Sequence, residues 1–263
     1  NGEKIETVVD WTSPKDRRFK VERFYRSDNS FALINQMSSV DISAHAGIWQ
    51  QGWDEGIFRQ TFFGSHNIIY VRSDGKRFEF DGTTYAELAG GNEYVLSYDD
   101  IADEYTIRDY SGTKAVYKTG SSSGYLLSDR YWSDGYHLQI SRDSSGRVGS
   151  VKDNRNQFAS FVWTTVNYTG ADADVVTKIS FDTNYNGTSL QPEISIDYQY
   201  GGNTVIAGPN PPWLTSVNLI DEGTSATHLT AQYSYDATGN AFPPPITKIY
   251  DGRLDAAGQP FPF

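Results

Sequence analysis

Aromatic residues are the side chains in this sequence best placed to bind a ligand. Tyr131, Trp132 and Tyr136 fall within one short stretch that also contains Ser133, Asp134 and Gly135. Flat aromatic faces beside polar groups can stack on a sugar ring. Because we expect this stretch to be a loop, we predict that Tyr131, Trp132 and Tyr136 contact a glycan. The alternative, favoured for Trp163 at the end of a strand, is that aromatic rings fill the inner face of a sheet.

Other polar clusters fit catalysis or metal binding poorly. The run Gly120-Ser121-Ser122-Ser123-Gly124 matches the spacing of a nucleophile elbow, but the strand-to-helix turn that such an elbow needs is not predicted around it. The acidic run from Asp99 to Glu104 lacks the glycine turn of a calcium loop, so we interpret it as a solvated loop. The histidines show no i, i+2 or i, i+4 pairing that would form a metal site; they are His45, His66, His137 and His228. We therefore expect no catalytic residue, no metal and no cofactor.

Composition excludes several classes of protein. The chain has 263 residues, no Cys and a net charge of -11, from 33 Asp and Glu against 22 Lys and Arg. It can have no disulfide framework and no thiolate chemistry. An acidic surface repels phosphate, so we expect neither a nucleic acid nor an anionic membrane as partner. We find no apolar stretch long enough for a membrane helix and no signal peptide after Asn1, and we interpret the chain as a processed or excised piece.

The elements that must position these residues are predicted to be strands. The sequence has 18 Tyr, 14 Phe and 6 Trp, with 24 Gly to punctuate them, a composition typical of β structure. Only Asn29 to Met37 and Ala86 to Ala89 could hold a turn or two of helix. The first segment alternates, which predicts that Ile5, Thr7, Val9 and Trp11 face one way, with a return strand over Phe19 to Tyr25.

A repeated unit of strand, polar turn and strand recurs along the chain. It is clearest from Gly146 to Trp163, and looser copies lie at Val71 to Phe80, Tyr105 to Tyr117, Leu229 to Asn240 and Ile246 to Leu254. Asp bonds nearby backbone amides and Gly accepts positive φ, which suits both to turns. One hairpin cannot bury its own face, so such units must stack side by side.

We therefore predict an all-β fold, an extended and spiralling antiparallel sheet of stacked hairpins. No linker separates two cores, and we expect one domain over residues 1–263, with pre-repeat strands in 1–120 and degenerate hairpins in 121–263. Gly170 to Asp174 is predicted to be a loop. The proline-rich end, Gln259 to Phe263, cannot be a central strand because its prolines remove hydrogen-bond donors.

In order along the chain, these motifs resemble a known family. Asn1 to Pro14, Phe24 to Ser27, Gly52-Trp53 and Val71 to Phe78 are similar to the segment before the repeats of RHS-repeat (YD-repeat) proteins, and the later hairpins are similar to the repeats. The chain thus resembles the N-terminal shell region of this family of bacterial toxin-delivery and cell-surface proteins, related to TcC toxin components and distantly to teneurins. The C-terminal core signature and any toxin domain of the family are missing from these residues.

The resemblance implies a non-enzymatic segment of a β-shell that encapsulates or delivers a toxin or effector, in a secreted or cell-surface protein of a bacterium. Its expected partner is the remainder of a larger shell, or another copy of the chain, joined through sheet edges. Two alternatives stay open. One is a secreted carbohydrate-binding or adhesion module, and the other is a glycoside hydrolase, which needs two carboxylates roughly 5 to 9.5 Å apart in a cleft.

Overall fold

The structure, a computed structural model, describes residues 5–26, 49–62, 65–88, 91, 93–120, 124–168, 171–201, 213–235, 246–254 and 260–262. These residues form strands and turns without any helix, and all strand pairs are antiparallel. No segment among them is a helix able to cross a membrane. The predicted all-β fold is confirmed.

Three strands near the N-terminus form a small sheet in the order β1-β2-β3. They are β1 (Ile5–Thr12), β2 (Lys20–Arg26) and β3 (Trp49–Gln51). The pairing of β1 with β2 runs from Ile5↔Arg26 to Thr12↔Lys20, which confirms the predicted return strand.

The predicted alternation along β1 is wrong after Val9. The register shifts between Val9 and Trp11, so Asp10 forms a bulge. Val9 is therefore 49% exposed whereas Trp11 is only 8% exposed. A strict period of two would have placed both side chains on one face, and the extra residue turns Trp11 into the core.

The other sixteen strands form one large sheet that does not close into a barrel. They are β4 (Gly56–Phe62), β5 (Ser65–Val71), β6 (Arg77–Asp81), β7 (Tyr94–Asp99), β8 (Glu104–Asp109), β9 (Lys114–Thr119), β10 (Gly124–Tyr131), β11 (His137–Arg142), β12 (Val148–Asp153), β13 (Phe158–Tyr168), β14 (Ala171–Asp182), β15 (Ile194–Gly201), β16 (Trp213–Asp221), β17 (Ala226–Tyr235), β18 (Ile246–Leu254) and β19 (Pro260–Pro262). From β10 to β19, each strand pairs with the next one in the chain, as stacked hairpins require. The predicted extended antiparallel sheet is confirmed.

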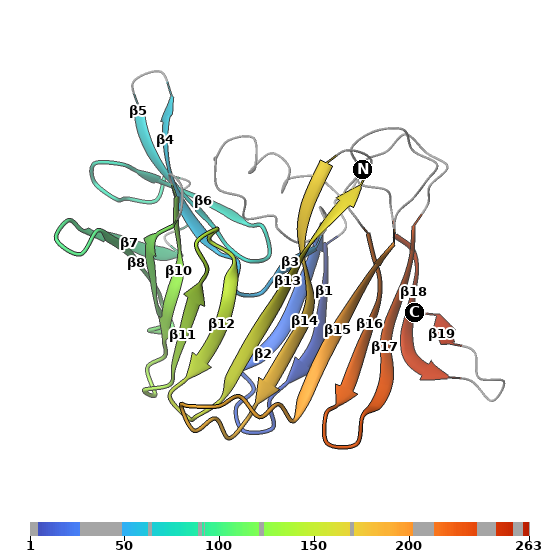
Figure 1. The fold of residues 1–263 in the computed structure, drawn as a ribbon. Coiled ribbons are helices and arrows are strands. Elements are labelled where there is room, and N and C mark those ends of the chain that lie inside the picture. Colours follow the sequence, from blue (N-terminus) through green and yellow to red (C-terminus); the bar gives the residue numbers. More distant parts are fainter. Residues whose placement is uncertain are drawn as a thin grey trace.

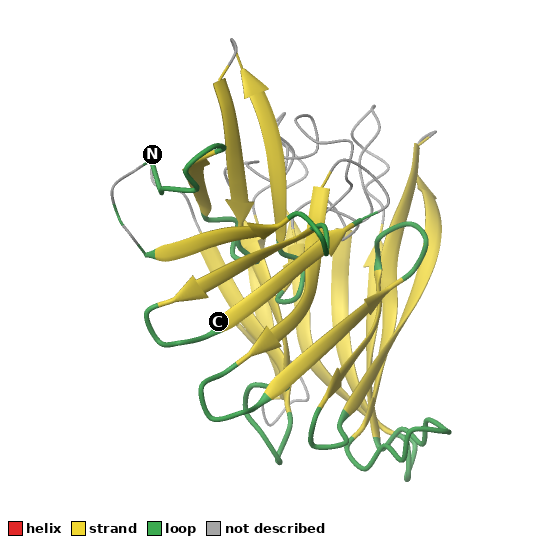
Figure 2. Ribbon diagram, turned by 90° about the vertical axis from the view of Figure 1, so that its left-hand side faces the viewer, coloured by secondary structure: helices red, strands yellow, loops and turns green. Residues whose placement is uncertain are grey.

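The sheet forks at β10. This strand pairs with β9 over Tyr125 to Tyr131, while its first residues also pair with β4 and its last ones with β11. One branch therefore continues through β4, β5 and β6, a second through β9, β8 and β7, and the long run begins with β11. Figure 2 shows how far the strand direction turns across the molecule.

The small sheet packs against the long run of the large sheet. In Figure 1, β1 and β2 lie behind β13 and β14. The Trp11 ring stacks on Phe181 of β14 with centroids 4.2 Å apart, and Phe19 lies 6.3 Å from Trp53. Both sheets thus contribute to one apolar core.

Two kinds of turn recur among the described strand connections. In the first, three loop residues are closed by backbone hydrogen bonds, and the third residue has positive φ, the geometry of a type I turn with a bulge. The positive-φ residues are Gly75, Gly112, Gly135, Gly146 and Asn156. In the second kind, an Asp side chain accepts bonds from the backbone N–H groups two and three residues later, as Asp81, Asp99 and Asp221 do.

Several local predictions need correction. Ala86 to Leu88 is not helical, and Glu87 instead bridges to Phe80. Ala171 to Asp174 belongs to β14 rather than to a loop. The hairpin expected over Ile246 to Leu254 is instead a single strand, β18, which pairs with β17 as far as Asp251. The helix expected at 29–37 lies outside the described residues.

Candidate functional site: the Tyr136 clamp

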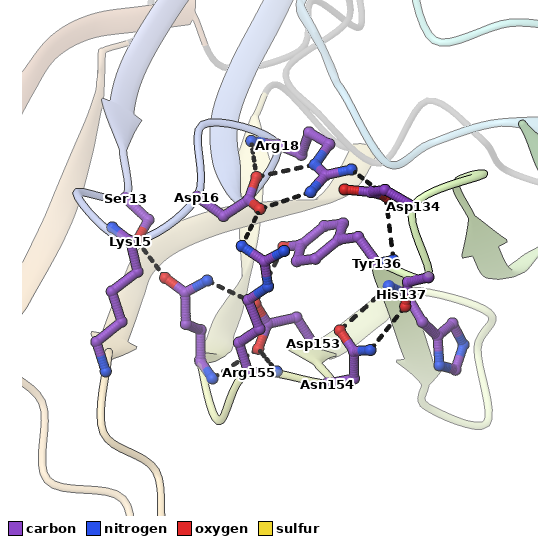
Figure 3. Close-up of polar contacts among 12 residues, drawn as sticks. Ser13, Lys15, Asp16, Arg18, Asp134, Tyr136, His137, Asp153, Asn154 and Arg155 are labelled. Atoms are coloured by element: carbon purple, nitrogen blue, oxygen red, sulfur yellow. Dashed lines mark hydrogen bonds and ion pairs between the residues drawn. The ribbon is translucent and has the colours of Figure 1, made fainter. Parts of the chain in front are cut away.

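A polar cluster joins three turns at one rim of the large sheet (Figure 3). We call it the Tyr136 clamp, and it consists of Asp16, Arg18, Asp134, Tyr136, Asp153 and Arg155. Asp16 and Arg18 come from the β1–β2 turn, Asp134 and Tyr136 from the β10–β11 turn, and Asp153 and Arg155 from the β12–β13 turn. The clamp therefore fixes the small sheet to two successive hairpins of the large one.

The β1–β2 turn presents its charges through local bonds. Asp16 Oδ1 accepts from the backbone N and from Nε of Arg18, both at 2.9 Å, and Oδ2 accepts from Nη2 at 2.7 Å. This bidentate pairing fixes the plane of the guanidinium. Its Nη1 then donates to Asp134 Oδ1 at 2.8 Å, and Arg155 Nη1 donates to Asp16 Oδ2 at 2.7 Å. Each arginine thus links two turns.

Tyr136 is at the centre of these ion pairs and only 1% exposed. The Arg18 guanidinium lies over its ring at 4.0 Å from the centroid, and that of Arg155 at 5.1 Å. Its hydroxyl donates to Asp153 Oδ2 at 3.0 Å. Cation–π attraction and a satisfied hydroxyl both favour the buried ring.

Asp153 organises the β12–β13 turn from within. Its Oδ1 accepts from the backbone N–H groups of Arg155 and Gln157, at 2.9 and 2.7 Å, and its Oδ2 accepts from Gln157 Nε2 at 2.5 Å. Ser13 Oγ in turn donates to Gln157 Oε1. Asn154 links this turn to the start of β11, because its side-chain oxygen accepts a hydrogen bond from the backbone N–H of His137 at 3.2 Å.

The charges of the clamp are stable near neutral pH. Hydrogen bonds from Arg18 lower the pKa of Asp134 to about 2, and they also lower the pKa of Asp16. Burial, together with the charge of Asp153, raises the pKa of Tyr136 far above its usual range. These two carboxylates are ionised and the phenol is neutral at pH 7, an arrangement that suits a fixed joint between turns better than proton transfer.

A second, fully buried ion pair seats the small sheet deeper in the molecule. Arg23 Nε and Nη2 donate to the two oxygens of Asp10, at 2.5 and 2.7 Å. Tyr198 of β15 donates to Asp10 Oδ2 at 2.8 Å, and Arg23 Nη2 lies 2.9 Å from the hydroxyl oxygen of Tyr233 in β17. Asp10, the bulge residue that turns Trp11 inward, thus also anchors β1 to the large sheet.

The structure brings the three predicted glycan contacts into neighbouring positions. Trp132 is half-buried and its ring lies 5.2 Å from that of Tyr136, while Tyr131 is 37% exposed and stacks on His137 at 4.2 Å. Arg18 lies over both Trp132 and Tyr136, at 5.4 and 4.0 Å. Glycan contact by this trio stays a prediction, and Tyr131 and Trp132 are its accessible members.

The other candidate residues do not assemble into a site. Ser121 to Ser123 lie outside the described residues, and they connect two antiparallel strands, β9 and β10, where a nucleophile elbow needs a strand and a helix. His66, His137 and His228 lie on β5, β11 and β17, and His45 is not described. Within the described ranges, no three His, Asp or Glu residues lie close enough to hold a metal ion.

Sequence reasoning missed the clamp because its partners are far apart in the chain. Arg18 and Asp134 are separated by 116 residues, and Arg155 and Asp16 by 139. The available signal was local: charged residues crowd into the segment between the first predicted strand and its return strand at Phe19. Such a cluster indicates a polar contact without naming the partner.

Comparisons with known proteins find likeness in solved structures alone. No protein-family description matches the chain, and no curated protein does. The chain is similar to one in the Tc holotoxin pore of Photorhabdus luminescens, with a TM-score of 0.49 and 8% identity over 88% of this chain. It is also similar to chains in TcdB2-TccC3-Cdc42, with a TM-score of 0.47 and 9% identity over 98%, and in TcdB2-TccC3, with 0.41 and 10% over 99%.

The chain spans 15 to 16% of the length of each of these toxin chains.

Proposed function

We propose that this chain is a non-enzymatic wall segment of an RHS-type shell that encapsulates or delivers an effector, in a secreted or cell-surface assembly of a bacterium. The observation that carries the proposal is the uninterrupted series of antiparallel pairs from β10 to β19 in a sheet that stays open. An open sheet is a surface that further strands can extend. Residues 1–120 would supply the starting strands and residues 121–263 the stacked hairpins.

The edges of the large sheet differ in how well they could accept another strand. Two of the three residues of β19 are prolines, which have no N–H to donate. The backbone of Ala86 and Leu88 already bonds to Asp81 and Glu79 of β6. Among the described residues, β7 pairs only with β8, and its Val95 is 61% exposed. We therefore expect β7 to be the edge that recruits the rest of the shell or a second copy.

The small sheet would act as the anchor of the wall. It covers the face of the long run through Trp11 and Phe181, and the Tyr136 clamp locks it at the rim. An enclosed effector would therefore contact surfaces other than the one that β1 and β2 cover. The acidic net charge of -11 favours a soluble assembly over a membrane-bound one.

Association through β7 is tested by light scattering coupled to size exclusion, at rising protein concentration, together with amide hydrogen exchange. We expect larger species to form with concentration and β7 amides to become protected as they form. The matched variant is Val95→Lys, which places a charge on the same exposed position and should keep the protein monomeric. A chain that stays monomeric throughout, with β7 amides already protected, would contradict the proposal.

A further inference from the structure

A cavity of about 230 Å³ lies in the fork where the sheet divides at β10. Its lining comes from different branches: Tyr70 and Arg72 from β5 and the turn after it, Tyr94 from β7, and Asp109 and Arg130 from β8 and β10. The space is smaller than the roughly 300–1,000 Å³ of pockets for drug-sized ligands. It suits a ligand about the size of one sugar ring.

The base of the cavity is already organised. Glu55, 2% exposed, accepts hydrogen bonds at Oε2 from Tyr70 (3.1 Å), Tyr117 (2.9 Å) and Arg130 Nη2 (2.6 Å). Burial raises the pKa of both tyrosines, so they remain donors. A ligand would meet a floor that does not need to rearrange, which lowers the cost of binding.

The lining carries charges of both signs, two acidic residues, Glu55 and Asp109, and two basic ones, Arg72 and Arg130. Arg130 is paired with Glu55, and Arg72 is paired with Asp74 and donates to the Tyr94 hydroxyl at 3.0 Å. Asp109 is the remaining charged residue of the lining. A ligand with a full charge would face groups of both signs, whereas a neutral polar ligand can use both without leaving a charge unpaired.

Several polar groups of the lining still have bonding capacity. Asp109 Oδ1 accepts from Thr113 N at 2.9 Å and Ser111 Oγ at 2.6 Å, while Oδ2 accepts from none of the described residues. Arg130 donates through Nη2, and its other N–H groups reach no acceptor in the described part of the chain. The indole N–H of Trp132 likewise has no acceptor there, and its ring forms part of the wall.

We propose that this cavity binds a single neutral pyranose ring. Adjacent hydroxyls of the sugar would donate to Asp109 and accept from Arg130, and Trp132 or Tyr94 would cover its apolar face. Of the three glycan contacts predicted from the sequence, the site uses Trp132 and replaces Tyr131 and Tyr136 with residues of the fork. The proposal does not depend on the shell role.

The test is ligand-detected NMR and calorimetry on the whole chain. The probes are glucose, galactose, mannose and their methyl glycosides, with glucuronate and glucosamine as charged counterparts. We expect at least one neutral sugar to bind with a millimolar Kd, and its charged counterparts to bind at least about tenfold more weakly. If the methyl glycoside binds as well as the free sugar, the ligand is the terminal residue of a glycan; if only the free sugar binds, it is a monosaccharide.

Variants locate the binding. Asp109→Asn keeps Oδ1, the acceptor that closes the turn, and replaces Oδ2 with an amide nitrogen that cannot accept from a sugar hydroxyl. The affinity for the sugar should therefore fall about tenfold. Trp132→Phe should lower it about fivefold. Tyr131→Ala, which is outside the cavity lining, should change it less than about twofold. Absence of binding by every neutral sugar at about 50 mM, or wild-type affinity in both folded cavity variants, would overturn the proposal.

Discussion

The bulge at Asp10 predicts that two neighbouring apolar residues of β1 differ sharply in their effect on stability. Trp11 is 8% exposed, stacks on Phe181 at 4.2 Å and meets the edge of Phe19 at 6.3 Å. Truncation of such a residue to alanine costs about 3–5 kcal/mol of unfolding free energy, of which the aromatic pair contributes about 0.5–1.5 kcal/mol. Val9 is 49% exposed, so Val9→Ala should cost about 0.5 kcal/mol or less.

Urea unfolding followed by far-UV circular dichroism measures both variants without relying on tryptophan emission. Trp11→Ala should lower the midpoint strongly and leave β content unchanged before the transition, while Val9→Ala should overlay the unmodified chain. A strand with regular alternation would place both residues on one face, and Val9→Ala would then also be clearly destabilising. Comparable losses for the two variants, or a loss below about 1 kcal/mol for Trp11→Ala, would refute the bulge and the packing of the small sheet.

Three further predictions concern the polar joints and the turns. Removal of one partner of the buried pair, by Arg23→Met, should cost about 3–5 kcal/mol in urea unfolding, and adding Asp10→Leu should recover part of the loss, because the uncompensated charge is then gone. The folded-state pKa of Asp134, about 2, lies below its unfolded value of about 3.9. The clamp's contribution to the stability of the folded chain is therefore present above pH about 4 and lost as the pH falls toward 2. The urea midpoint should drop across that window, and less so in Arg18→Met, whereas an equal drop in both proteins would contradict the clamp. Gly135 has a φ of +82° and no atom within 4 Å of an added Cβ, so Gly135→Ala should lower the unfolding free energy by about 1 kcal/mol through backbone strain alone. Gly135→Asn should lose less, because Asn adopts positive φ more readily than Ala. Thermal melting measures both, and equal losses in the two variants would exclude strain as the cause.

The parts of the fold that could be predicted are those encoded locally. The pairing of β1 with β2 follows from the alternating run that reaches Trp11 and from the return strand predicted over Phe19 to Tyr25. The turn at Asp153 follows from a side chain that bonds amides two and four residues later. The same reasoning failed for the hairpin expected over Ile246 to Leu254, because these residues form one strand, β18, that pairs with β17.

The candidate site could not be predicted for the same reason, because its contacts join residues that are far apart in the sequence. The stretch from Tyr131 to Tyr136 was expected to be a loop, and it is a tight hairpin turn whose Tyr136 is buried. Its burial depends on Arg18 and Arg155, which reach it from two other turns. The fork at β10 is equally non-local, because one strand edge is shared by β4 and β11. No periodicity within a strand encodes such a division.

The anchoring of β1 and β2 also fixes an order of events during synthesis. Arg23 leaves the ribosome 210 residues before Tyr233, and Asp10 leaves it 188 residues before Tyr198. At about 5–20 residues per second, the hairpin waits roughly 10–40 s for the strands that bury it. Trp11 likewise gains its stacking partner Phe181 only when β14 has been made. The β1–β2 hairpin therefore docks through Asp10 and Arg23 only after β15 and β17 have been made, and these contacts report that this part of the wall is in place.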